Sequence, residues 1–270
     1  MTLKEAVEIL KNAGVENPLY DAREIFHRIG KIPRERLVLG GETEDGSDTA
    51  RAVFLRAERT PLEYIIGNVD FYRETYLVCR DCLIPRDDTE ILVDFAVKNI
   101  PSGANIIDLC TGSGCVALSV LNNTDKTRAT AADISEGALA LAKKNAERLG
   151  LSDRVEFLLC DALEKPVAKS CFAVLCNPPY VTEDEYPELS PEIHKEPKIA
   201  FVGGKDGLDF YRRITELYRD VIDDSGFIAF EIGCSQAKAI FEIANSFKMS
   251  CQTIPDLSGH DRVCVLRKSL

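Results

Sequence analysis

The stretch "NIIDLCTGSGCVALSVL", Asn105 to Leu121, decides the fold class of this chain. Its first residues are apolar and β-branched, which predicts a buried strand at 105–109 with Asp108 at its end. Gly112 and Gly114 then allow a tight turn and a close approach of a ligand to the backbone. A helix is expected at 114–122. The Gly-x-Gly spacing lacks the third glycine of the dinucleotide fingerprint, so this turn alone does not establish a ligand site.

The same alternation of strand and helix continues to the end of the chain. Strands are expected at 105–109, 128–133, 155–159, 172–176 and 226–232, and helices at 89–99, 114–122, 135–149, 207–222 and 235–247. Such alternation predicts an α/β fold with a parallel sheet covered by helices on both faces. The last segment, "MSCQTIPDLSGHDRVCVLRK", reads as two strands joined by a loop, so we expect an antiparallel pair at the edge of the sheet.

The front of the chain has a different pattern and predicts a small helical bundle at residues 1–67. Thr2 is placed to cap a first helix that ends at Gly14, and Asn17-Pro18 opens a second that ends at Gly30. A short helix after Pro33, a polar loop at 40–47 and a helix up to Thr60-Pro61 follow. Alternating aromatic and polar residues at 69–84 predict a β-hairpin connector. The expected domains are therefore 1–67, the connector at 68–84, and 85–270.

Composition excludes several classes of protein. The 270 residues are 45% hydrophobic and carry a net charge of −11, which is unsuited to neutralising long stretches of phosphate backbone. The ten cysteines are scattered, as expected for reduced thiols in a cytoplasmic protein. Cys79 and Cys82 lack the second pair or nearby histidines that a zinc site needs, so no metal is expected. No apolar run is long enough for a membrane span, and the amphipathic N-terminus is not a signal peptide.

Two further acidic residues follow strands and suggest a nucleoside ligand. Asp133 lies 19 positions after Gly114, at the end of the strand 128–133, where a carboxylate can accept both hydroxyls of a ribose. The alternative is that Asp133 or Ser135 only caps the next helix. Asp161 and the backbone N–H of Ala162, after the third strand, can reach an adenine edge. Since nothing here neutralises several phosphates, S-adenosylmethionine is the best candidate, with its amino-acid end at the glycine turn and Asp108.

The stretch "CFAVLCNPPYV", Cys171 to Val181, supplies the reactive side at the same sheet edge. An amide or aromatic amine is a poor nucleophile, because its lone pair is delocalised. The side-chain oxygen of Asn177 and the carbonyl of Pro178 can accept both of its N–H groups and aim the lone pair at a methyl donor. Pro178 and Pro179 hold these acceptors rigidly, and Tyr180 can stack on the flat group. The alternative is a rigid turn without chemistry.

Taken together, the motifs resemble those of a known family. "PLEYIIG…DFY", "LIPRDDTEILVD", "DLCTGSG", "AADIS", "LCNPPYV", "KEPKIAFVGGKDGLDFY" and "FEIG" are similar to segments of the HemK/PrmC family, the peptide chain release factor glutamine methyltransferases. DNA adenine-N6 methyltransferases share Asn-Pro-Pro-Tyr. "PRDDTE" at 85–90 and "EPKIAFVGGKDGL" at 196–208 are more specific to the HemK/PrmC family.

The resemblance implies a fold, a donor and an acceptor. The fold is a class I S-adenosylmethionine methyltransferase domain, a Rossmann-like seven-stranded sheet, behind a helical domain that recognises the substrate. The acceptor is the glutamine of the Gly-Gly-Gln motif in class 1 peptide chain release factors. The implied cofactor-binding residues are Asp108, Cys110, Thr111, Gly112, Ser113, Gly114, Asp133, Ile134, Asp161, Ala162, Asn177 and, near the methionine end, Thr89 and Glu90. The implied catalytic and substrate-binding residues are Asn177, Pro178, Pro179 and Tyr180. The resemblance leaves Glu231, at the end of the fifth strand, as structural.

The chain departs from the family pattern at a few positions, and other functions stay open. Cys110 stands where glycine is common, Asp87 where proline is frequent, and Ala162 where an aromatic residue is frequent, which affects adenine packing. The alternatives are a nucleic-acid adenine-N6 methyltransferase, a non-catalytic cofactor-binding protein, and a methyltransferase for glutamine in another protein or for a small amide. The negative net charge disfavours a nucleic-acid methyltransferase. The intact Asn177-Pro178 and Asp133 disfavour a non-catalytic cofactor-binding protein. We expect a monomer without direct nucleic-acid or membrane partners.

Overall fold

The computed structural model describes residues 1–38 and 46–269, which form two compact units. Unit 1 contains Met1–Val69 together with Ser190–Lys195, and unit 2 contains Asp70–Leu189 and the chain from Glu196 onward. Most of the polar loop expected at 40–47 lies outside the described residues. The two units are described separately below.

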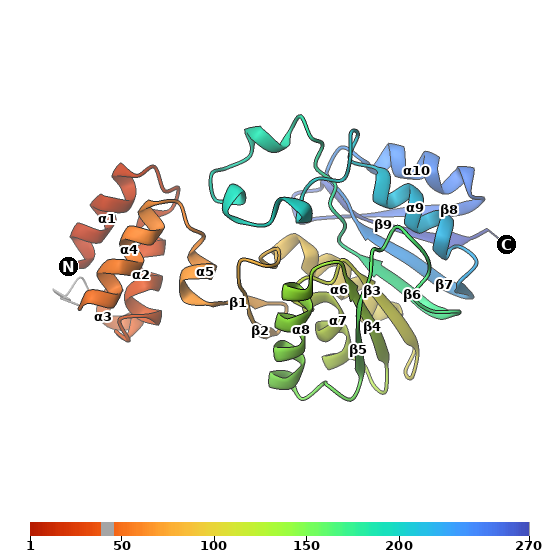
Figure 1. Cartoon of the computed structure of the whole chain (residues 1–270), viewed down its shortest axis with the longest axis horizontal. Coiled ribbons are helices and arrows are strands. Elements are labelled where there is room, and N and C mark those ends of the chain that lie inside the picture. Colours follow the sequence, from red (N-terminus) through yellow and green to blue (C-terminus); the bar gives the residue numbers. More distant parts are fainter. Residues whose placement is uncertain (39–45, 270) are drawn as a thin grey trace. The chain divides into compact units, whose positions relative to one another are not determined.

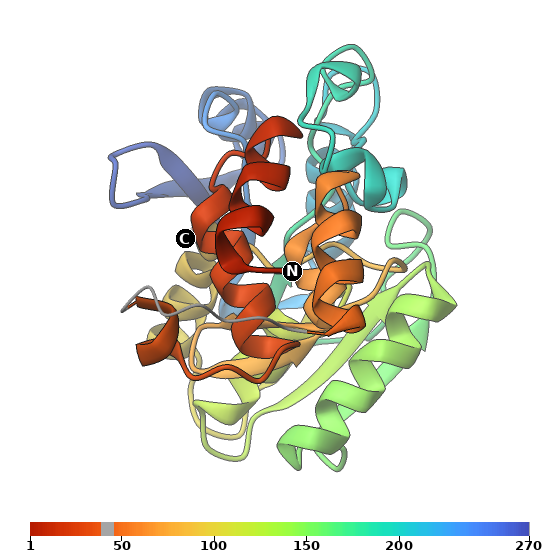
Figure 2. The ribbon, with the colours of Figure 1, turned by 90° about the vertical axis from the view of Figure 1, so that its left-hand side faces the viewer.

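Unit 1 is a helical bundle, as predicted. Its elements are α1 (Leu3–Asn12), α2 (Pro18–Arg28), α3 (Arg34–Val38), α4 (Ser47–Ala57) and α5 (Leu62–Ile66). In Figure 2 the helices α1, α2 and α4 lie side by side, and they bury the apolar residues Leu10, Ile25, Phe26 and Val53 between them. Thr2 caps α1 as expected: its hydroxyl accepts from the Glu5 N–H while the Glu5 carboxylate accepts from the Thr2 N–H. The short helix α5, which begins after Pro61, was not predicted.

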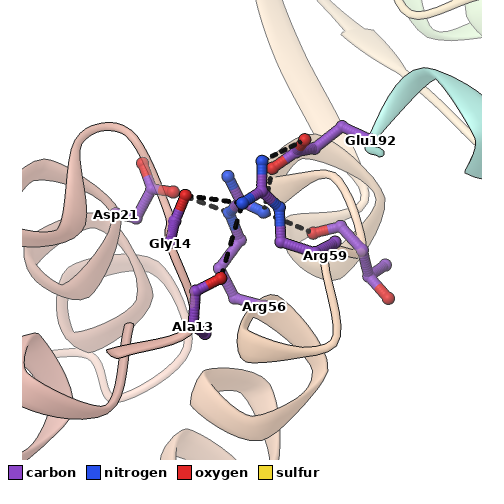
Figure 3. Close-up of polar contacts among 7 residues, drawn as sticks. Ala13, Gly14, Asp21, Arg56, Arg59 and Glu192 are labelled. Atoms are coloured by element: carbon purple, nitrogen blue, oxygen red, sulfur yellow. Dashed lines mark hydrogen bonds and ion pairs between the residues drawn. The ribbon is translucent and has the colours of Figure 1, made fainter. Parts of the chain in front are cut away.

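A distant segment of the chain completes unit 1. Residues 190–195, which include the 3₁₀ turn η3 (Ile193–Lys195), contribute Glu192. Its carboxylate accepts from Arg56 at 2.8 Å and from Arg59 at 2.7 Å, and Arg56 also donates to Asp21 at 2.6 Å (Figure 3). Residues 136 positions apart are thus joined around one guanidinium group.

Unit 2 is built on a seven-stranded sheet of order β5-β4-β3-β6-β7-β9-β8. The strands are β3 (Asn105–Leu109), β4 (Arg128–Asp133), β5 (Val155–Leu159), β6 (Cys171–Cys176), β7 (Ile222–Glu231), β8 (Met249–Pro255) and β9 (Asp261–Lys268). The first five in this order pair in parallel, whereas β9 runs antiparallel to both β7 and β8. The predicted C-terminal antiparallel pair is confirmed, with β9 inserted between β7 and β8.

Helices cover both faces of this sheet (Figure 1). One group contains α6 (Glu90–Asn99), α7 (Cys115–Asn122) and α8 (Glu136–Leu149), and the other contains α9 (Asp209–Tyr218) and α10 (Ala237–Ser246). The ring of Phe227 contacts Phe95 of α6, and the ring of Phe230 contacts Tyr211 of α9. Because residues three apart on a strand point to opposite faces, β7 is buried on both sides.

The connector is shorter than the expected hairpin. Strands β1 (Asn68–Phe71) and β2 (Glu74–Leu77) pair, but the pattern at 79–84 does not continue as strand. At Leu77 the backbone N–H and C=O instead bond the side-chain amide of Asn145 in α8, at 2.8 and 3.1 Å. Side-chain bonding therefore ends the ladder where the alternation in sequence predicted more of it. Within the described residues, the helices are all too short or too polar to span a bilayer.

Candidate functional site

The predicted site residues follow four neighbouring strands at one edge of the sheet. The register pairs Leu109 of β3 with Ala132 of β4 and with Cys176 of β6, and Asp133 of β4 with Leu159 of β5. The turns after these strands therefore begin at nearly the same level. This parallel register, rather than closeness in sequence, brings the candidate groups together.

A large pocket of about 230 Å³ opens at this edge; we call it the large pocket. Its lining includes the predicted residues Cys110, Gly112, Asp133, Ile134, Asp161, Ala162, Asn177 and Pro179. The remaining wall comes from residues that were not predicted, among them Cys82, Leu83, Leu163, Ile199 and Phe210. The wall is therefore largely apolar, with a few carboxylate, amide and backbone groups that can direct a ligand.

Asp133 ties the glycine turn to the start of α8. Its carboxylate accepts from the backbone N–H of Gly112 at 2.8 Å and from that of Ser135 at 2.9 Å. The cap of α8 is Ser135, whose hydroxyl accepts from the N–H of Ala138. Burial raises the pKa of Asp133, although these N–H groups act in the opposite direction. Ser135 therefore performs the capping role, while Asp133 faces the large pocket.

The turn after β3 has an unusual backbone. Gly112 and Gly114 have φ of 56° and 82°, and Cys110, which is not a glycine, has φ of 58°. This left-handed conformation explains why glycine is frequent at the position of Cys110, since a side chain there is strained. A Cβ on Gly114 would also approach Leu118 at 3.0 Å and Ala142 at 3.1 Å. The turn can therefore take little additional bulk.

The adenine side predicted after β5 consists of a local turn and apolar residues. The Asp161 carboxylate accepts from the N–H of Leu163 at 2.8 Å. Within residues 1–38 and 46–269, the backbone N–H of Ala162 has no hydrogen-bond partner. Ile134 has 51% of its surface exposed, an unusual state for a large apolar residue, and it lines the large pocket. This side of the pocket thus offers an apolar face and a free donor.

A second cavity of about 30 Å³, the loop pocket, lies beside the glycine turn. Its lining contains the predicted residues Thr89, Asp108, Cys110, Thr111, Gly112, Ser113 and Asn177. Asp108 accepts from the Thr111 hydroxyl at 2.5 Å and from the N–H of Ala117 at 3.2 Å. Burial nevertheless raises the pKa of Asp108 to about 7, a carboxyl poised near neutrality at the bottom of the turn.

A third cavity of about 40 Å³, the tyrosine pocket, is lined by Leu83, Arg86, Asn177, Tyr180, Val181, Ala200, Phe201 and Glu231. Arg86 is held by the buried carboxylate of Glu196, which also accepts from the N–H of Ile84 at 2.9 Å. Glu196 belongs to the "EPK" segment, and Arg86 to "PRDDTE". The two segments that most specifically marked the resemblance therefore meet at this pocket.

Asn177 lines all three pockets and is held by a short chain of side chains. Its Nδ2 donates to the hydroxyl of Thr89 at 3.1 Å, and that hydroxyl donates to Glu231 at 2.5 Å. Glu231 is buried at the end of β7, and burial raises its pKa to about 7. The sequence predicts Thr89 as a cofactor-binding residue and Glu231 as structural, and it does not predict the hydrogen bonds that join them to Asn177.

The backbone of Pro179 and Tyr180 rests on glycines from the "VGGKDG" segment. A Cβ on Gly203 would lie 2.2 Å from the Pro179 carbonyl oxygen, and one on Gly207 would lie 2.2 Å from that of Tyr180. Gln236 donates to the same Tyr180 oxygen at 3.0 Å. Repeated glycines after a buried strand were the available signal for such close approach, which sequence reasoning did not use.

Three predicted residues line none of these pockets, namely Glu90, Gly114 and Pro178. The Glu90 carboxylate accepts from the backbone N–H of Tyr72 at 2.6 Å, in the turn of the β1–β2 hairpin. Pro178 is buried and lines none of the three pockets. Among the residues that the structure describes, no three His, Cys, Asp or Glu side chains are grouped as a metal site.

Two family models match the chain. The methyltransferase small domain matches residues 87–196, and the PrmC N-terminal domain matches residues 2–67. These matches cover the central part of unit 2 and most of unit 1.

Curated relatives match over nearly the full length. A release factor glutamine methyltransferase of Clostridium acetobutylicum is 35% identical over 97% of this chain and 95% of its own. A protein with the same name from Thermodesulfovibrio yellowstonii is 38% identical over 92% of each chain.

Solved structures bear on the fold. A methyltransferase from Pyrococcus furiosus is 18% identical and covers 72% of this chain and 89% of its own, with a TM-score of 0.54. At this identity the likeness concerns the fold alone, and the predicted class I methyltransferase fold is confirmed.

Proposed function

Because the chain belongs to the release factor glutamine methyltransferase family, we propose that it methylates the glutamine of the Gly-Gly-Gln motif in class 1 peptide chain release factors. The methyl group would come from S-adenosylmethionine and go to the side-chain amide nitrogen. The observation that carries the proposal is the place of Asn177, which lines all three pockets. A group held by Asn177 can therefore face a ligand in the large pocket.

The residues of the large and loop pockets fit S-adenosylmethionine. Asp133 can accept the ribose hydroxyls, and the unpartnered N–H of Ala162 can donate to an adenine ring nitrogen beside the apolar face of Ile134. Asp108 in the loop pocket can pair with the positively charged amino group of the methionine end. When bound, this cofactor supplies an electrophilic methyl group on a sulfonium centre.

The acceptor side must raise the reactivity of an amide nitrogen. The side-chain oxygen of Asn177, which lines all three pockets, accepts one N–H group of the substrate amide and turns its lone pair toward the methyl donor. The proposal also needs the carbonyl of Pro178, a buried residue that lines none of the three pockets, to accept the other N–H group. The ring of Tyr180, in the tyrosine pocket, packs against the flat amide. The nitrogen would form one new N–C bond while the methyl–sulfur bond of the donor breaks and a neutral thioether leaves. The nitrogen would release one proton to solvent after the transfer, so a strong base is not required beforehand.

Unit 1 is proposed to bind the release factor away from the reacting glutamine. A separate helical unit with its own apolar core can bind part of a protein substrate without entering the catalytic pockets. Removing residues 1–67 should then raise the KM for the whole release factor much more than for a short Gly-Gly-Gln peptide. Equal effects on both substrates would contradict this role, provided that circular dichroism shows the shortened protein to be folded.

The central experiment uses the full chain with S-adenosylmethionine and unmethylated release factor. Mass analysis of the Gly-Gly-Gln peptide should show a gain of one methyl group on glutamine. Asn177→Ala should remove most turnover, by on the order of 10²–10³ in rate, as for loss of a preorganised polar contact. Asn99→Ala, at an exposed asparagine on α6, is the matched control. Methyl transfer to adenine in DNA or RNA, with none to the release factor, would overturn the proposal.

A further inference from the structure

Three side chains from distant parts of the sequence form the hydrogen-bonded chain behind Asn177. Glu231 ends β7, Thr89 precedes α6, and Asn177 follows β6. Glu231 and Thr89 are each only 2% exposed, so water does not compete for their bonds. The Thr89 hydroxyl oxygen lies 2.5 Å from Glu231 Oε2 and 3.1 Å from Asn177 Nδ2. This chain is therefore a buried link from a carboxyl group to the residue that lines all three pockets.

The donors and acceptors in this chain can be assigned from chemistry alone. An ionised carboxylate only accepts hydrogen bonds, and a hydroxyl has a single hydrogen to donate. While Glu231 is ionised, the Thr89 hydrogen is committed to it, and the Thr89 oxygen can only accept. Asn177 must then present its NH₂ group to Thr89, which leaves its oxygen directed elsewhere.

We propose that Glu231 and Thr89 are positioning residues that set the direction of the Asn177 amide, so that its oxygen faces the substrate nitrogen. This inference rests on the proposed methyl transfer to an amide, and it assigns to Thr89 a role other than binding the cofactor. The reversed amide would present NH₂ to the NH₂ group of the substrate. Two donors facing each other cannot hydrogen-bond, so the reversed form does not hold the substrate for reaction.

A neutral side chain at position 231 no longer fixes the direction of the Asn177 amide. A protonated carboxyl or an amide can donate to the Thr89 oxygen, and the Thr89 hydrogen is then free to turn toward Asn177. Both directions of the Asn177 amide then satisfy the hydrogen bonds to Thr89. Only the fraction of the enzyme whose Asn177 oxygen faces the substrate can catalyse the transfer. The ionised state of Glu231 is thus a requirement for a single orientation.

The charges around Glu231 are mixed, so its ionisation can change near neutral pH. Burial raises its pKa to about 7, and Asp88 adds to this effect, whereas the Thr89 hydroxyl, Arg262 and Arg86 oppose it. Tyr180, Tyr211 and Cys115 also face this region, and burial raises the pKa of both phenols and of the thiol, so all three remain neutral. The kcat of the enzyme should accordingly rise as the pH increases through about 7.

The test compares variants that change one property each. Thr89→Val removes the hydroxyl at nearly constant side-chain volume, whereas Thr89→Ser keeps the hydroxyl. Glu231→Gln keeps the side-chain volume and the capacity to hydrogen-bond, but it replaces a carboxylate that can only accept with an amide that can also donate. Thr89→Val and Glu231→Gln should lower kcat for release factor by roughly 2- to 10-fold, because the two directions of the Asn177 amide become similar in free energy and only a fraction of the enzyme is competent. Thr89→Ser should stay near the wild type, and cofactor affinity measured by calorimetry should change little throughout. Glu74→Gln alters another buried glutamate bonded to a hydroxyl, that of Ser119, and serves as control.

A second measurement does not depend on activity. In protein labelled with ¹⁵N-asparagine, the side-chain NH₂ signals of Asn177, assigned by their loss in Asn177→Ala, should shift with a midpoint near pH 7. This shift should vanish in Glu231→Gln and persist in Glu74→Gln. The inference would be overturned if Glu231→Gln kept the wild-type kcat and the same fall of kcat at acidic pH. It would also be overturned if the Asn177 NH₂ signals of the wild type did not change with pH. If the wild type does not methylate release factor, the proposed function fails instead, and the NMR titration still decides the polarity of Asn177.

Discussion

Arg56 and Glu192 form an ion pair at 2.8 Å although 136 positions separate them in the chain. Arg56 belongs to α4, and Glu192 to a segment that leaves unit 2 after Leu189 and returns to it at Glu196. The chain that follows Tyr180 is therefore anchored in unit 1 before it supplies Pro197, Ala200 and Phe201 to the pockets. This anchor makes the stability of unit 1 depend on residues that sequence alone assigns to the other domain.

Replacing Arg56 should destabilise unit 1. Arg56→Ala leaves the carboxylates of Asp21 and Glu192 without this cation, and removal of one partner from a buried ion pair costs about 3–5 kcal/mol. Hydrogen exchange at the amides of α1, α2 and α4 measures this cost. Arg51→Ala, an exposed arginine on the same helix, should change protection by no more than about 0.5 kcal/mol. Equal protection in the two variants would mean that the network is not a source of stability.

Gly203→Ala should disturb the Asn-Pro-Pro-Tyr backbone without replacing any residue that lines a pocket. Its Cβ would lie 2.2 Å from the Pro179 carbonyl oxygen, so the backbone must shift. Misplacement of about 1 Å at a reacting group can cost on the order of 10²-fold in rate, so kcat should fall by roughly 10- to 100-fold. In Gly46→Ala the new Cβ has no atom of the described residues within 4 Å, so this variant is the control. Steady-state kinetics with release factor decides: an unchanged kcat in Gly203→Ala would show that the contact yields easily.

Asp133→Ala should weaken cofactor binding more than it changes turnover at saturation. It removes the carboxylate proposed for the ribose hydroxyls and releases the N–H groups of Gly112 and Ser135. Lost hydrogen bonds to a charged group correspond to about 1–3 kcal/mol, which calorimetry with S-adenosylmethionine measures directly. Glu156→Ala, at an exposed carboxylate on β5, provides the comparison. An unaltered dissociation constant would remove Asp133 from the cofactor site.

Unfolding should reveal the raised pKa of Glu231. The folded pKa of about 7 lies above the ordinary value of 4.5, so the folded state holds the proton more tightly. The stability from this group is complete below about 4.5 and is lost as the pH rises through about 7. Relative to Glu231→Gln, the wild type should therefore lose up to about 3 kcal/mol between these pH values. Urea unfolding at several pH values measures this difference, and a difference that is constant with pH would contradict the assignment.

The local elements could be predicted because short-range physics decides them. The five parallel strands and the helices around them match the predicted ranges to within two residues at most of their ends, since the apolar period, glycine and proline act within a few residues. Thr2 and Ser135 each act as the cap of a helix for the same reason. The boundary between the predicted helix 207–222 and the predicted strand 226–232 was wrong, because α9 ends at Tyr218 and β7 already begins at Ile222. The predicted hairpin is longer than the observed one. The Asn145 side chain, which comes from a helix nearly seventy positions away, bonds the backbone at Leu77 and ends the hairpin there.

The roles of individual residues depended on longer-range contacts. Sequence alone determined an α/β methyltransferase fold that follows a helical bundle along the chain. It also brought Asp108, Asp133 and Asn177 to one sheet edge through the order of strands and turns. Only the tertiary structure decided that Glu231 and Thr89 hold Asn177, that Gly203 supports Pro179, and that Glu192 joins Arg56. The physical reason is that a hydrogen bond or a close contact depends on positions in space to within tenths of an ångström. Periodicity in a sequence determines which face a residue occupies, but not which distant group it meets there.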